Sequence, residues 1–322
     1  MGIERFFSSL DSSKITGQFA QVLNKKLKVA QLYMDFNSVV YGVIQKLLTK
    51  LNYLLLCILK GKRTDPKAIS YIRELELPSD LLSSKDAIAF KKQFEGKFSV
   101  TNLLLKQILI YLEEIYRTLI VPEELRLLYI AIDGVPSRAK MQEQKKRRYL
   151  GSILGSLRKR IFAKYEAELK KDHSLRFTYE SHKFSWNLGQ ITPGTPFMTS
   201  LDELLKGKEF LALLHKIFPN LGSYTFSGSA VPGEGEKKIV NQILKVKLKN
   251  TSCAIYSPDS DVTLLALILL NRLPSNTFYL LRYDQNKELY NLIRINQFEE
   301  NIAAYVKTKI SKKTEDTRLL DD

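Results

Sequence analysis

Three short apolar segments along the chain each end in an aspartate. They are residues 28–35, 127–133 and 253–259. Apolar segments of this length predict strands that are buried on both faces, as in a parallel sheet covered by helices. Longer segments with helical periodicity lie between and after them, at residues 38–60, 101–118, 138–171, 201–217, 235–248 and 297–309. This alternation predicts an α/β fold with a twisted, mainly parallel sheet flanked by helices.

Two further stretches break the pattern. Residues 62–100 are polar, charged and weakly periodic, which predicts an insertion on the sheet scaffold. The Gly and Pro residues within 180–200 predict an irregular loop. We find no internal repeat, so the expected organisation is one core over residues 1–322 with an insertion at 62–100. The most apolar stretch, 47–59, is interrupted by Lys50 and predicts a buried helix, so no membrane partner is expected.

Carboxylates gather where the predicted strands end. Because the carboxyl ends of parallel strands share one edge, where ligands bind, these side chains are expected to lie together. Glu234 and Glu236 lie in a Gly- and Pro-rich turn into a helix, and both reach one site only if Glu234 occupies the cap position. Asp259 and Asp261 are two residues apart in a segment that is expected to be extended, so their side chains are expected to point to the same side of the chain. The six candidate residues are Asp35, Asp133, Glu234, Glu236, Asp259 and Asp261.

So many like charges in one cleft would repel each other and raise each other's pKa values. Hard divalent cations relieve this conflict, and oxygen-only ligands suit Mg²⁺ or Mn²⁺. The chain has only three His and two Cys, which disfavours zinc. The set therefore predicts a site for two metal ions, which would activate a water molecule to hydrolyse a phosphodiester. The alternative is that these acids cap helices or pair with surface lysines.

Net charge points to a polyanionic partner. The formal net charge is +16, and residues 136–171 alone hold twelve Lys or Arg against three Glu. Lys140, Gln144, Arg147 and Arg148 fall within a sector of about 100° on a helix. Such a compact face suits a terminal phosphate, which Arg binds through paired hydrogen bonds. The alternative is a solvated helix with ion pairs four residues apart, for which Glu143 is the available acid.

Several stretches resemble the XRN family of 5′→3′ exoribonucleases. They are residues 1–7, 32–37, 131–148, 191–198, 227–236 and 257–261, of which the third and fifth are long and specific. The resemblance implies a flap-endonuclease-like, or PIN-like, nuclease core. It implies that the six acids are metal ligands and that Lys140, Gln144, Arg147 and Arg148 bind a 5′-monophosphate. Tyr41 stands where the family has a base-stacking His, so we expect stacking there, or else an ordinary helix residue packed on the sheet.

The expected function is therefore Mg²⁺-dependent (or Mn²⁺-dependent) 5′→3′ decay of single-stranded, 5′-monophosphorylated RNA to 5′-nucleotides. The alternatives are a non-catalytic RNA-binding protein of the same fold and a flap-type DNA nuclease. The sequence stops near Asp321 and Asp322, before the family's last acidic motif, second stacking aromatic and following domain. We expect the isolated chain to be weakly active and to need a C-terminal segment or second polypeptide. Its two cysteines favour the cytoplasm, with the nucleus as the alternative.

Overall fold

The computed structural model describes residues 20–318, apart from 173, 260 and 285–286. The stretch 1–7, residue 260 and the end 319–322, all used above, lie outside the described residues. The described chain divides into two compact units. The first takes the residues up to Ser38, Glu113–Gly134 and those from Leu205 onwards; the second takes Val39–Leu112 and Val135–Leu204. A single core with an insertion stays a prediction, and each unit is described by itself.

The first unit contains one sheet. In the described part of the chain, seven strands form it in the order β1-β7-β6-β5-β2-β3-β4. The strands are β1 (Ala20–Val22), β2 (Gln31–Asp35), β3 (Leu127–Ala131), β4 (Ser223–Ser227), β5 (Ser252–Tyr256), β6 (Thr277–Asp284) and β7 (Leu289–Arg294). From β6 to β4 all neighbours are parallel, whereas β7 pairs antiparallel with β6 and with β1. The predicted α/β class and mainly parallel sheet are confirmed.

The middle strand of the parallel part of the sheet is β2, which lies between β3 and β5. All five residues of β3 and the first four of β2 are buried, as expected for strands covered on both faces. In the register, Asp35 lies opposite Ala131 of β3, and Met34 opposite Tyr256 of β5. The chain therefore leaves all three strands at the same edge, next to the point where the strand order reverses, which is where open α/β sheets bind ligands.

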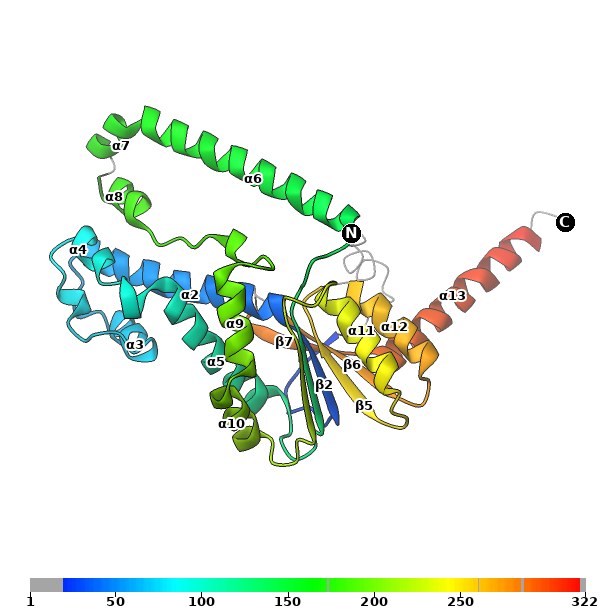
Figure 1. Cartoon of the computed structure of the whole chain (residues 1–322). Helices are drawn as coiled ribbons and strands as arrows, with labels where there is room; N and C mark the ends of the chain where they lie inside the picture. The colour runs from blue at the N-terminus through cyan, green and yellow to red at the C-terminus, as the bar shows by residue number, and fades with distance from the viewer. Residues whose placement is uncertain (1–19, 173, 260, 285–286, 319–322) are drawn as a thin grey trace. The chain divides into compact units, whose positions relative to one another are not determined.

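Three helices of the first unit share one core with the sheet. They are α11 (Gly235–Val246), α12 (Asp261–Arg272) and α13 (Ile295–Arg318), and α11 and α12 lie beside the strands in Figure 1. Ile239, Ala266 and Phe298 of these helices pack with Tyr33 and Tyr129 of the sheet. A fourth helix, α10 (Lys208–Ile217), contacts β4 through the rings of Phe210 and Tyr224, 5.6 Å apart.

The second unit is helical. It contains α2 (Phe36–Leu59, from Val39), α3 (Pro66–Glu74), α4 (Ala87–Lys92), α5 (Val100–Leu119, to Leu112), α6 (Arg138–Lys164), α7 (Glu166–Asp172), α8 (Ser174–His182) and α9 (Pro196–Lys206, to Leu204), with 3₁₀ turns at Leu81–Ser83, Gly96–Phe98 and Leu188–Gln190. The expected insertion at 62–100 is thus built of short helices. Asp65 and Asp86 begin two of them, because their carboxylates accept hydrogen bonds from the Ala68 and Ala89 amides (2.9 and 2.8 Å).

Some predicted elements differ from the observed ones. The segment 138–171 is two helices, α6 and α7, divided at Tyr165, and 201–217 is divided at Gly207, whose extended backbone starts α10. Four observed strands were not predicted from the sequence: β1, β4, β6 and β7. Of these, β4 is half-exposed and lacks a run of apolar residues. By length and composition α2 could cross a membrane. A core helix has the same character, and one side of α2, from Val39 to Leu55, is buried.

We predict that Gly134→Ala destabilises the first unit. A Cβ at Gly134 would lie 1.8 Å from the Val231 carbonyl oxygen, and the Gly134 amide donates a 2.9 Å hydrogen bond to the Gly233 carbonyl. Because the obstacle is backbone, the loop at 231–233 must move, and the midpoint of thermal unfolding should fall by several degrees.

The matched control is Gly155→Ala in α6, where no described atom lies within 4 Å of the added Cβ. Alanine is the better helix former by about 0.5–1 kcal/mol, so this variant should unfold at the wild-type temperature or slightly above it. Equal unfolding temperatures for Gly134→Ala and the wild type would show that the loop adapts freely.

Candidate active site at the carboxyl edge of the sheet

All six predicted acids belong to the first unit, around the ends of three adjacent strands. Asp35 is the last residue of β2, and Asp133 and Asp259 follow β3 and β5 by two and three residues. Glu234 is the N-cap of α11, which begins at Gly235. This confirms the condition under which Glu234 and Glu236 can reach one site.

Asp133 is held by two neighbours. The Asn37 amide donates to one of its carboxylate oxygens (2.9 Å), while the Asp133 backbone amide donates to the Asn37 side-chain oxygen (3.2 Å). The Gly235 amide, at the N-terminus of α11, donates to the other carboxylate oxygen (2.7 Å). A helix N-terminus favours a negative charge, so α11 both orients and stabilises this carboxylate.

Asp35 lies in a crowded position beside Asp133. The Ser257 hydroxyl, at the end of β5, donates to Asp35 Oδ2 (3.0 Å). Gly235 leaves room for the pair, since a Cβ there would lie 3.0 Å from Asp35 Oδ1 and 3.4 Å from Asp133 Oδ1. Glycine at position 235 therefore lets the first turn of α11 approach both carboxylates without crowding them.

The crowding raises the pKa of Asp35 to about 7, from an ordinary value of 3.8. Burial is the main cause, and the negative charges of Asp133 and Asp259 add to it, whereas the hydrogen bond from Ser257 acts in the opposite direction. The pKa of Glu236 is likewise raised to about 7, first by burial, then by a hydrogen bond with Glu234 and by the charges of Asp259, Glu234 and Asp35.

These effects place five of the six acids in one electrostatic group: Asp35, Asp133, Glu234, Glu236 and Asp259. The role of Asp261 as a metal ligand stays a prediction, but the expectation that it lies in an extended segment is wrong. Asp261 is the first residue of α12, and its backbone amide donates to Asp259 Oδ1 (3.2 Å). Asp259 therefore caps the start of the helix, and its side chain is fixed by that contact.

Two cations belong to the surroundings of the group. Lys238 is buried, and its ammonium donates to the carbonyls of Ile132 (2.7 Å) and Gly228 (3.0 Å), which ties the ends of β3 and β4 to α11. Arg282 of β6 donates to the Pro258 carbonyl (2.7 Å). Burial lowers the pKa of Arg282, while the charges of Asp259 and Asp284 raise it.

The donor chemistry of this group fits a hard divalent cation. Its side chains offer carboxylate oxygens, which are the usual ligands of Mg²⁺ and Mn²⁺, and the raised pKa values show negative charges that are poorly compensated by the protein itself. As they stand, no three His, Cys, Asp or Glu side chains among the described residues converge into a metal site. Small side-chain rotations would therefore accompany binding of an ion.

The basic helix face belongs to the second unit. None of the described residues of α6 is buried, so packing does not account for its composition. Arg147 pairs with Glu143 four residues earlier, as the solvated-helix alternative expects for this residue. Arg148 instead donates to the Thr192 hydroxyl (2.9 Å), which in turn donates to the Gly189 carbonyl (2.6 Å). The phosphate-binding role of Lys140, Gln144, Arg147 and Arg148 stays a prediction.

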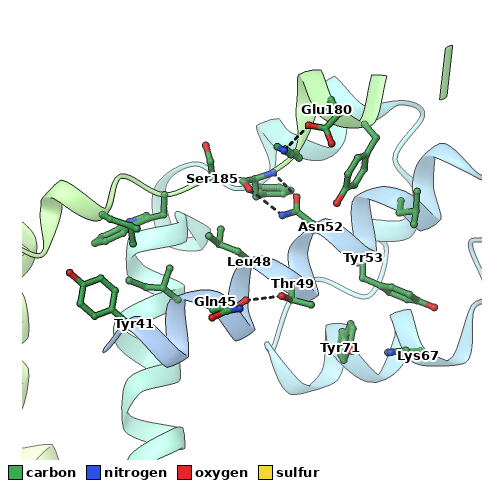
Figure 2. Close-up of a pocket in the computed structure, with 17 residues that line it drawn as sticks. Tyr41, Gln45, Leu48, Thr49, Asn52, Tyr53, Lys67, Tyr71, Glu180 and Ser185 are labelled. Carbon is green, nitrogen blue, oxygen red and sulfur yellow. Dashed lines mark hydrogen bonds and ion pairs between the residues drawn. The ribbon is translucent and has the colours of Figure 1, made fainter. Parts of the chain in front are cut away.

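Tyr41 also belongs to the second unit. Its side chain is 45% exposed and lines a groove along α2 (Figure 2). Stacking on a base stays a prediction for this residue, and so does the alternative of an ordinary helix residue packed on the sheet.

A family model described as the N-terminus of XRN 5′–3′ exonucleases matches residues 83–284, which include the basic helix and five of the six acids. The chain belongs to the XRN 5′–3′ exonuclease family. Its mainly parallel sheet flanked by helices is consistent with the PIN-like nuclease core that the resemblance implied.

Curated relatives agree with this membership. The chain is 34% identical over 157 residues to a protein of Acanthamoeba polyphaga mimivirus that is provisionally named a 5′–3′ exonuclease. It is 34% identical over 155 residues to 5′–3′ exoribonuclease 2 of Schizosaccharomyces pombe and 36% identical over 155 residues to that of Cryptococcus neoformans. These matches cover 46%, 44% and 44% of this chain but only 24%, 15% and 13% of the relatives.

Reasoning from sequence missed the residues that hold the acids in this XRN-family site. Asn37, Ser257 and Gly235 each lie one or two positions from a predicted acid, and this proximity was the available signal. Lys238 gave none, because a lysine in an amphipathic helix normally faces water. Its ammonium group can be buried because it donates hydrogen bonds to two backbone carbonyls at the ends of the strands.

We predict that Asp35→Asn stabilises the metal-free protein in a pH-dependent way. Because the folded pKa of Asp35 is about 7 and the ordinary value is 3.8, the folded state holds a proton that the unfolded state releases. Stability contributed by this proton is lost as the pH rises from about 4 through 7. Thermal unfolding in a chelator should show a larger gain for the variant at pH 8 than at pH 4.5.

Glu209→Gln in α10 is the matched control, because Glu209 is an exposed acid of the same unit. Its effect on the unfolding temperature should be small and alike at both pH values. A gain for Asp35→Asn that is equal at the two pH values would contradict a raised pKa.

Proposed function

We propose that the chain is the catalytic core of a 5′→3′ exoribonuclease that hydrolyses single-stranded, 5′-monophosphorylated RNA to 5′-nucleotides. The observation that carries this is the group of five interacting carboxylates at the carboxyl edge of the sheet, in a chain of the XRN family. The names of the exoribonuclease 2 relatives support RNA as the substrate.

The chain's own residues would prepare the site before substrate arrives. Asn37 and the Gly235 amide hold Asp133 in one orientation, and Ser257 does the same for Asp35. With pKa values of about 7, Asp35 and Glu236 are partly protonated near neutral pH, which lowers the repulsion in the group. Bound Mg²⁺ or Mn²⁺, in two sites formed by these carboxylates, would supply activation of water and stabilisation of the leaving oxygen.

The basic face of α6 would select the RNA end. A 5′-monophosphate presents two negative charges and several acceptor oxygens, which Arg147, Arg148 and Lys140 can neutralise and Gln144 can donate to. A 5′-hydroxyl end offers none of these charges. Binding the end first and cutting after the first nucleotide gives degradation in the 5′→3′ direction. Cytoplasmic location and dependence on a second polypeptide stay predictions.

We predict that Asp259→Asn reduces decay of 5′-phosphorylated RNA in Mg²⁺ by about a hundredfold or more, because it removes a charge from the group while keeping the acceptor for the Asp261 amide. RNA binding in a chelator at low salt should persist, since phosphate contacts supply most of the affinity. Decay would be followed by release of nucleotides from labelled RNA.

Glu209→Gln serves again as the control and should leave decay unchanged. Wild-type decay by Asp259→Asn would remove this acid from the mechanism. A wild-type chain that binds RNA without cutting it would favour the non-catalytic alternative, and faster cutting of flapped DNA than of RNA would favour the DNA nuclease.

We predict that Arg148→Ala lowers the preference for 5′-phosphate over 5′-hydroxyl RNA. Loss of one charged hydrogen bond costs about 1–3 kcal/mol, or roughly five- to a hundredfold in the ratio of the two rates. Thr192→Val should have a smaller effect in the same direction, because Thr192 only positions the guanidinium. The measurement is competition between the two RNAs in one reaction.

Arg160→Ala is the matched control, since Arg160 is exposed on the same helix but faces away from the predicted pocket. It should keep the wild-type preference. If the wild-type chain degrades both RNAs at equal rates, the assignment of this face to the 5′-phosphate is wrong.

A further inference from the structure

A groove of about 770 Å³ runs along α2 within the second unit (Figure 2). Its volume falls within the range of about 300–1,000 Å³ that is typical of ligand sites. One wall is a face of α2, a second is α3, and a third is the end of α8 with the segment that follows it. Aromatic side chains dominate the lining: Tyr41, Tyr53, Tyr71, Tyr179, Phe184 and Trp186.

Hydrogen bonds and ring contacts hold the walls of the groove in place. The Asn52 side chain donates to the Phe184 carbonyl (3.1 Å) and accepts from the Phe184 amide (2.6 Å), so the segment after α8 is fastened to α2. The Phe184 ring packs edge-on against Phe90 and Phe94, at centroid distances of 5.8 and 4.8 Å. These contacts fix the walls before any ligand arrives, which lowers the entropic cost of binding.

The end of the groove that is lined by α3 combines aromatic rings with a cation. Tyr53 and Tyr71 lie edge to face, 5.6 Å apart, and the Lys67 ammonium lies 5.1 and 5.7 Å from their ring centres. Lys67 and Tyr71 belong to α3, in the stretch 62–100 that the sequence set apart as an insertion. The insertion therefore contributes an aromatic and a basic group to this groove.

The other end holds Trp186, the one tryptophan of the sequence. Its indole NH donates to the Thr101 hydroxyl (3.3 Å), and its ring packs edge-on against Phe197 at 4.8 Å. Between the ends, Gln45 and Thr49 present polar groups along α2. From Tyr41 to Tyr53 the helix spans about 18 Å, which matches about five nucleotides of a stacked strand.

We propose that this groove of the second unit binds the bases of single-stranded RNA through residues other than the six acids and the four residues of the basic helix face. Rings take the faces of bases, polar side chains meet their edges, and Lys67 neutralises backbone phosphate, which is the combination used for single-strand binding. The net charge of +16 favours such a polyanion over an apolar peptide. The choice of RNA rests on the proposed function.

Trp186 provides the readout. With the full chain in a chelator, a short 5′-hydroxyl oligoadenylate should quench its fluorescence and reach saturation. A duplex RNA of equal length should quench far less, because its bases are paired within the helix and cannot turn out towards the rings. The 5′-hydroxyl end and the chelator remove any contribution from the phosphate pocket or from cleavage.

Tyr71→Ala and Lys67→Glu should each weaken the apparent affinity by about fivefold or more, since base–aromatic stacking is worth about 1–3 kcal/mol per base. Lys85→Glu is the matched control: it makes the same charge change at an exposed position of the same unit outside the groove, and should bind like the wild type. Circular dichroism would confirm that the variants are folded, and Lys67 is exposed, so its replacement leaves the fold intact.

Absence of quenching, equal quenching by duplex RNA, or wild-type affinity in both groove variants would overturn the proposal. These outcomes are independent of catalysis. A chain that degrades 5′-phosphorylated RNA but shows no quenching keeps the proposed function and loses the groove. A chain that is quenched but never cuts RNA keeps the groove and loses the nuclease.

Discussion

Repulsion among carboxylates at one edge of the sheet is the constraint on which the first unit depends. Parallel pairing of β2 with β3 and β5 brings Asp35 and the residues after the other two strands to that edge. The fold thereby concentrates charges that would otherwise separate, and burial at the end of β2 makes them still more costly. Protons on Asp35 and Glu236 reduce this cost at neutral pH, and a bound cation would replace them.

The surrounding polar contacts partly offset the electrostatic repulsion among these carboxylates. Lys238 places a buried positive charge on α11 and bonds the carbonyls where β3 and β4 end, so one side chain both joins the strand ends and adds a compensating charge. Gly235 brings the helix N-terminus within reach of Asp133. A side chain at 235 would crowd the carboxylates of Asp35 and Asp133, because its Cβ would lie 3.0 and 3.4 Å from their oxygens.

The sequence predicts those parts of the fold that have strong local signals. The strands ending at Asp35 and before Asp133 and Asp259 are mostly apolar, so they were recognisable, whereas β4 is half-exposed and pairs with β3. Asp65 and Asp86 are ordinary helix caps, yet the helices that follow them were not predicted, because residues 62–100 are polar and only weakly periodic. The contacts of Ser257 and Lys238 join residues distant in sequence, which periodicity does not reveal.

The two arginines of the basic face are prepared differently for a phosphate. Arg147 is largely exposed and already paired with Glu143, but exposed ion pairs of this kind are worth only about 0–1 kcal/mol, so a phosphate carrying two charges can displace the carboxylate at little cost. Arg148 is instead held by the neutral Thr192 hydroxyl, and its charge stays uncompensated by that partner. If the basic face binds an RNA end as we propose, this preorganisation would make Arg148 the first contact, with Arg147 following once Glu143 is released.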